Sequence, residues 1–104
     1  MNMMEMLFGK KKDPASMAIE EALTLLEEKN FDAAIQVLRE KALSRDPGHR
    51  RALLHLGICH MLKGELDVAE GILSPIANRS GMDSEIAAAG IALDKIRADR
   101  AKMQ

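Results

Sequence analysis

The stretch LLHLGICHMLKGELDVAEGIL, residues 53–73, decides the fold of this 104-residue chain. Its apolar residues recur every three to four positions, which is the spacing of a helix with one buried face. Two glycines, Gly57 and Gly64, interrupt this pattern. Because a glycine within a helix costs roughly 1 kcal/mol relative to alanine, each glycine needs a structural reason. We expect two helices to approach closely at Gly57 and the chain to turn tightly at Gly64.

The composition of the whole chain favours helices over strands. It has no Trp, no Tyr and two Phe, whereas strands are usually rich in aromatic and β-branched residues. The formal net charge of −1 gives no general attraction for nucleic acid. No stretch approaches the roughly 18 apolar residues that a membrane span needs. Cys59 is the single cysteine, so no intrachain disulfide can form, and a reducing cytoplasmic setting fits.

Turn signals divide the chain after residue 13 into five expected helices. Breaks fall near Asn30, at residues 44–49 (SRDPGH), at Gly64 and at residues 78–83 (NRSGMD). The expected helices begin at Pro14, Asp32, His49, Asp67 and Ser84, and the last runs to about residue 102. We therefore predict an all-α protein.

Particular residues are expected to start, stop or bend these helices. Asp13 and Asp83 are predicted N-caps, and Gly81 is a predicted C-cap residue. Pro75 lies inside the fourth expected helix, where proline removes a hydrogen bond and clashes with the preceding turn. That helix should be kinked or end early.

Small residues recur at a fixed period along the chain. Ala22 and Gly57 are 35 residues apart, Gly57 and Gly90 are 33 apart, and Ala34 and Ala69 are again 35 apart. Periods of about 34 residues are typical of stacked helical hairpins. Successive helices should therefore pair as antiparallel hairpins that stack on one another.

At these positions the chain resembles the tetratricopeptide repeat family over roughly residues 14–100. The second repeat supplies Leu53, Leu56, Gly57, His60, Gly64, Leu66, Ala69 and Leu73 in register, with His60 in the usual Tyr position. The first repeat supplies Ala22, Leu25, Phe31, Ala34, Leu38, Ala42 and Pro47, with one extra residue between Leu38 and Ala42. The last helix matches through Ile86, Ala89, Gly90 and Leu93 and looks like a capping helix. The resemblance implies a right-handed superhelix of antiparallel helical hairpins, with five helices, over residues 14–101. It also implies that Gly57 faces Ala69 where the two helices of the second hairpin cross.

The resemblance also implies where a partner binds, because first helices of successive repeats line a concave groove in this family. The corresponding positions are Ile19, Leu23, Leu26, Arg51, Leu54, His55, Ile58, Met61, Ala87 and Ile91. Most are aliphatic, which suits an amphipathic helix or an apolar peptide better than a C-terminal carboxylate. We expect a protein–protein interaction module, such as a small adaptor or chaperone.

The N-terminal residues 1–13 allow two other interpretations. They are expected to form a flexible arm, in which the apolar segment Met3–Phe8 precedes the basic cluster Lys10–Lys12. The arm and the groove could together make a self-associating scaffold, a homo-oligomer. Alternatively the arm could touch a membrane surface, although three lysines are too few for stable anchoring alone.

Three chemically active side chains cluster in the third expected helix. His55 and Cys59 are four residues apart and share a helix face, and His60 is adjacent. Zinc needs four ligands, or three and a water, and the further histidine, His49, falls at a turn. A cysteine nucleophile needs a lowered pKa and an oriented base, which this arrangement does not supply. We expect no metal, no cofactor and no enzyme activity, with Cys59 packed in the core and His60 filling the aromatic position.

Overall fold

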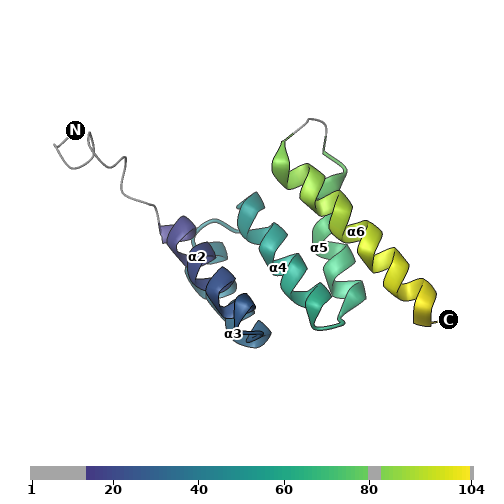
Figure 1. Cartoon of the computed structure of the whole chain (residues 1–104). Helices are drawn as coiled ribbons and strands as arrows, with labels where there is room; N and C mark the ends of the chain where they lie inside the picture. The colour runs from purple at the N-terminus through teal and green to yellow at the C-terminus, as the bar shows by residue number, and fades with distance from the viewer. Residues whose placement is uncertain (1–13, 80–82, 104) are drawn as a thin grey trace, which may run out of the picture.

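A computed structural model describes residues 14–79 and 83–103 of the chain as an array of helices that lie side by side (Figure 1). The elements are α2 (Pro14–Glu27), α3 (Phe31–Val37), the π-helix η1 (Leu38–Leu43), α4 (Arg50–Leu62), α5 (Leu66–Ala77) and α6 (Ser84–Met103). Because η1 continues α3 without a break, the described residues form five helical segments and contain no strand. This confirms the predicted all-α class and the number of helices.

The helices pack as two hairpins and one further helix. The first hairpin is α2 with α3 and η1, and the second is α4 with α5; α6 packs on both α4 and α5. Helix α4 also contacts α2 and α3, so it joins the two hairpins. Its residues Ala52, Leu56 and Cys59 belong to a core cluster shared with the first hairpin, whereas Leu54 belongs to a second cluster shared with α5 and α6.

Gly57 lies where α4 and α5 come closest, as the sequence predicts. A Cβ atom at this position would lie 2.6 Å from both Cγ and Cδ2 of Leu73 and 3.3 Å from Cγ2 of Ile72. The repeat pattern predicts that Gly57 faces Ala69. The side chain that fills the space is instead Leu73, one helical turn beyond the buried Ala69. Gly57 is therefore required by packing.

The turns of the two hairpins have the same backbone conformation. Gly64, between α4 and α5, has φ of +86°, and Lys29, between α2 and α3, has φ of +62°. The two residues are 35 positions apart, which is the repeat period. Glycine adopts a positive φ without steric cost, whereas lysine does not. The prediction of a glycine turn at Gly64 is thus confirmed, and the first hairpin makes the equivalent turn with a strained residue.

The extra residue of the first repeat is absorbed by the π-helix η1. This helix spans Leu38–Leu43 and contains the interval between Leu38 and Ala42 in which the repeat has one residue too many. A π-helix holds more residues per turn than an α-helix, because its hydrogen bonds run from residue i to i+5. Both Leu38 and Ala42 consequently remain fully buried.

The ends of the helices agree with most of the predicted boundaries. The amide of Ala52 donates to Nδ1 of His49, the N-cap of α4, at 3.2 Å. Asp83 accepts from the amide of Ile86 at 2.9 Å and so caps α6 as predicted. Helix α5 runs through Pro75 and ends two residues later, at Ala77. The predicted arm, 1–13, and the predicted cap residue Gly81 lie outside the described residues.

Candidate interaction groove

The helices expected to line a groove, α2, α4 and α6, are neighbours in the structure. Helix α4 lies between α2 and α6 and contacts both (Figure 1). Each of these helices is the first of a hairpin or, for α6, occupies the equivalent position in the repeat. Their exposed side chains can therefore contribute to one continuous surface.

Helix α4 presents a mixed stripe of side chains to this surface. Arg51 is exposed, and His55 and Ile58 follow it at spacings of four and three residues, both half-buried. Met61, one turn further, is also half-buried and packs against the second core cluster. The stripe is thus basic at the start of α4 and apolar toward its end.

Helix α6 contributes the most accessible apolar side chain of the predicted set. Ile91 is 71% exposed, and Ala87, one turn before it, is exposed too. On the opposite side of α4, Leu23 and Leu26 of α2 are half-buried against the first core cluster. Apolar side chains are therefore accessible on α2, α4 and α6, and Ile91 is the most exposed of the large ones.

Two of the predicted groove residues belong to the protein core. Ile19 is 0% exposed and lies with Ala18 and Ala22 in the first core cluster. Leu54 is 5% exposed and lies in the second cluster beside α5 and α6. Neither side chain can reach a partner, because neighbouring helices already cover it. The predicted groove residues that are exposed or half-buried are Leu23, Leu26, Arg51, His55, Ile58, Met61, Ala87 and Ile91.

His55 is the titratable group most affected by its position in this surface. Burial lowers the pKa of its imidazole from the ordinary value of 6.5, and the nearby positive charge of Arg51 lowers it further. The carboxylate of Glu85, on α6, acts in the opposite direction and is the weakest of the three influences. His55 is consequently held in its neutral form at pH 7 and adds no positive charge beside Arg51.

His60 faces a different group of residues from His55. Its Nδ1 donates to Oε1 of Glu65 at 2.9 Å, and Nη2 of Arg39 lies 3.5 Å from its Nε2. Lys63 binds the same Glu65 carboxylate at 3.4 Å and reaches Asp32 of α3 at 2.5 Å. The hydrogen bond from His60, and then Lys63, lower the pKa of Glu65.

This polar cluster joins the first hairpin to the turn of the second. The sequence gives no sign of this cluster, because Asp32 and Lys63 are 31 residues apart and no motif pairs them. The prediction that His60 fills the aromatic position is compatible with its burial, which leaves 8% of the residue exposed. In the described residues, His60 therefore supports packing between hairpins rather than the groove.

Cys59 is a fully buried side chain. It lies in the first core cluster, and burial raises the pKa of its thiol to about 11. At neutral pH the group is therefore protonated, and the thiolate needed for nucleophilic attack or metal binding does not form. Among the described residues, no three His, Cys, Asp or Glu side chains are placed to share a metal ion. Likewise, none of the described helices combines the length and apolar character that a membrane crossing requires.

Comparison with known proteins identifies the family. The tetratricopeptide repeat family matches residues 25–91, which is more than half of the chain. Together with the repeated helical hairpins, this match shows that the chain belongs to the tetratricopeptide repeat family. Members of this family are generally non-catalytic modules for protein–protein interaction. No curated protein and no solved structure matches the chain.

Proposed function

We propose that this protein is a small adaptor or chaperone that holds an apolar peptide or amphipathic helix of a partner protein against α2, α4 and α6. The observation that carries the proposal is Ile91, a large aliphatic side chain left 71% exposed in the middle of a predicted binding stripe. A single exposed apolar side chain of this size is common, but here it lies on α6, which packs against α4, the helix that carries the half-buried Ile58.

The chemistry of the surface favours an apolar ligand with limited charge. Leu23, Leu26, Ile58 and Ile91 offer aliphatic contacts from three helices, and His55 is neutral at pH 7. Arg51 is the positive group on the α4 stripe, so an acidic residue near one end of the ligand would be complementary. An amphipathic helix satisfies both requirements, because its apolar face can contact the groove while its charges reach the rim.

The setting proposed for this function is the cytoplasm. Cys59 is a free, buried thiol, which a reducing compartment preserves. We propose no catalytic role, since the groove holds no nucleophile paired with a base.

The test compares two single substitutions that place the same charge on exposed aliphatic residues. Ile91→Glu alters the groove, and Val68→Glu is the matched control on α5, where Val68 is 45% exposed. Tagged wild-type and variant chains are used to capture proteins from the lysate of the native host, and mass spectrometry identifies what is retained. We expect Ile91→Glu to reduce retention of a partner about tenfold or more, since a buried interface residue often contributes over 1 kcal/mol.

The controls separate binding from folding and from self-association. Circular dichroism should show the same helical signal for both variants, because both positions are exposed. Equal retention of partners by the two variants would contradict binding in this groove. If the chain captures only copies of itself and Ile91→Glu lowers the mass measured by light scattering, the self-associating scaffold is the correct function.

A further inference from the structure

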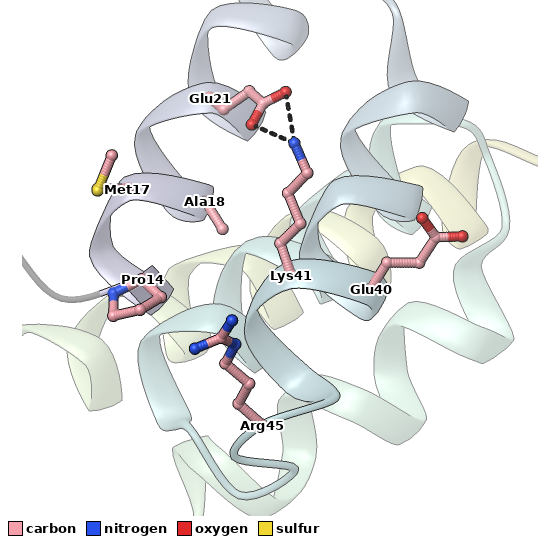
Figure 2. Close-up of a pocket in the computed structure, with 7 residues that line it drawn as sticks. All are labelled: Pro14, Met17, Ala18, Glu21, Glu40, Lys41 and Arg45. Carbon is pink, nitrogen blue, oxygen red and sulfur yellow. Dashed lines mark hydrogen bonds and ion pairs between the residues drawn. The ribbon is translucent and has the colours of Figure 1, made fainter.

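A second surface lies on the opposite flank of α2, away from α4. A hollow of about 350 Å³ is formed there between the first turns of α2 and the end of the first hairpin (Figure 2). Pro14, Met17 and Ala18 line it from α2, and the aliphatic stems of Lys41 and Arg45 line it from the other side. Lys41 Nζ binds both carboxylate oxygens of Glu21, at 3.1 and 3.4 Å, and this ion pair bounds one end of the hollow.

The hollow leaves a large apolar side chain uncovered. Met17 is 55% exposed, although it lies next to the buried Ala18. Among the described helices, α2 packs against α3, η1 and α4, and none of the others contacts it. The side of α2 that carries Met17 therefore has an apolar surface of the kind that another segment of chain can bury.

The position of the N-terminal residues makes them the nearest candidate for that segment. Residues 1–13 lead directly into Pro14, which itself lines the hollow. Phe8 precedes Pro14 by six residues, which span at most about 20 Å when extended. Because the segment is attached at the edge of the hollow, its effective concentration there is high, on the order of millimolar.

The composition of the N-terminal residues also matches the surface. Met3–Phe8 contains five apolar side chains, and Lys10–Lys12 follows before the helix begins. The charges that line the hollow balance, because Lys41 and Arg45 stand against Glu21 and Glu40, and Lys41 is paired with Glu21. Apolar contact therefore drives the docking, and the lysines that follow the apolar segment meet no net charge of either sign in the hollow.

We propose that the apolar segment Met3–Phe8 docks in the hollow between α2 and η1 of its own chain. This contact covers the flank of α2 that lacks a neighbouring hairpin, much as α4 covers the other flank. It leaves the groove on α2, α4 and α6 open, so it is independent of the function proposed above.

The absence of natural Trp and Tyr from the chain allows a direct test. In the full-length Phe8→Trp protein, all tryptophan fluorescence comes from residue 8. We expect emission that is blue-shifted from that of free tryptophan and protected from a soluble quencher. Adding Met17→Glu places a charge in the hollow and should abolish both the shift and the protection.

Matched substitutions decide whether this hollow is the docking site. Val68→Glu in the Phe8→Trp background should leave the emission blue-shifted, with circular dichroism confirming an unchanged fold for every variant. Emission like that of free tryptophan in the Phe8→Trp protein would overturn the proposal. So would a blue shift that survives Met17→Glu, or one abolished by Ile91→Glu, which would place the segment in the groove. A shift that disappears on dilution would also overturn it, because the segment would then bind a second copy.

Discussion

In the first hairpin Ala22 and Ala34 are both fully buried in one core cluster, whereas the equivalent positions of the second hairpin hold Gly57 and Ala69. The next repeat position is leucine in both hairpins, Leu38 and Leu73. In the second hairpin, Leu73 occupies the space that a Cβ at residue 57 would need. The first hairpin has an alanine, Ala22, at the position equivalent to Gly57, so a Cβ is present there. The second helix of this hairpin widens into a π-helix that begins at Leu38.

This difference shows how one repeat pattern permits two kinds of packing. Helices α4 and α5 approach closely because one partner has no side chain at the contact. In the first hairpin an alanine is retained, and an additional residue in η1 keeps Leu38 and Ala42 buried. Small residues at the repeat positions are therefore necessary for the fold, but their size decides how closely each pair of helices can pack.

Among the substitutions that test this difference between the hairpins, Gly57→Ala should change the free energy of unfolding the most. The new Cβ would lie 2.6 Å from Cγ of Leu73, a fully buried side chain that cannot simply rotate away. We expect a loss of about 1–3 kcal/mol in the free energy of unfolding, despite the better helix propensity of alanine. Urea denaturation followed by circular dichroism measures this change.

Gly90→Ala is the matched control for that substitution. Gly90 occupies the equivalent repeat position on α6, but a Cβ there would meet no atom within 4 Å. Alanine should therefore stabilise the protein, by roughly 0.5–1 kcal/mol, through helix propensity alone. If Gly57→Ala were as stabilising as Gly90→Ala, the close contact with Leu73 would not constrain the second hairpin.

The helices and their glycines could be predicted from sequence because they depend on local rules. Gly64 was predicted as a turn because glycine tolerates a positive φ, and Asp83 as an N-cap because its side chain accepts an amide hydrogen bond two or three residues later. The extra residue before Ala42 could be counted. The sequence does not predict where the extra residue goes in the structure. Either a π-helix or a loop could hold it, and the repeat pattern is the same in both cases.

The candidate groove could be predicted only in part, because exposure depends on how helices approach one another. Ile19 and Ile91 both occupy repeat positions assigned to the concave face, yet Ile19 is fully buried and Ile91 is the more exposed. Ile19 lies on the face of α2 that enters the first core cluster with Ala18 and Ala22. Ile91 falls outside the buried face of α6, which consists of Ala89, Ala92, Leu93 and Ile96. The same dependence on tertiary structure hid the ion pair between Asp32 and Lys63.

An intermediate effect is expected from exchanging the residues at the two turns. Gly64→Ala places a Cβ at φ of +86°, which should destabilise the protein by about 1–2 kcal/mol. Lys29→Gly removes a Cβ at φ of +62° in the equivalent turn and should stabilise it by roughly 0.5–1 kcal/mol. Thermal unfolding of the two single variants and the double variant measures both changes, and distant sites should add.

The comparison of the turns requires Gly64→Ala and Lys29→Gly to change the stability in opposite directions. Glu28→Ala, next to Lys29 in the same turn, is a control in which the positive φ residue is unchanged. A Lys29→Gly variant that is less stable than the wild type would show that the lysine side chain contributes more than its backbone strain costs. The two turns would then be equivalent in shape but not in energetics.

The smallest expected effect is on the pH dependence of stability, to which histidines contribute in the second hairpin and not in the first. All three histidines of the chain, residues 49, 55 and 60, belong to α4 or to its N-cap, and the first hairpin has none. Since burial lowers the pKa of folded His55 below 6.5, the unfolded chain binds a proton at this site more readily. Stability from this site is therefore complete above about pH 6.5 and declines as the pH falls below it. Thermal unfolding at pH 7 and at roughly pH 5 measures this loss, and His55→Gln should reduce it. Equal losses in the variant and the wild type would mean that His55 is not the responsible group.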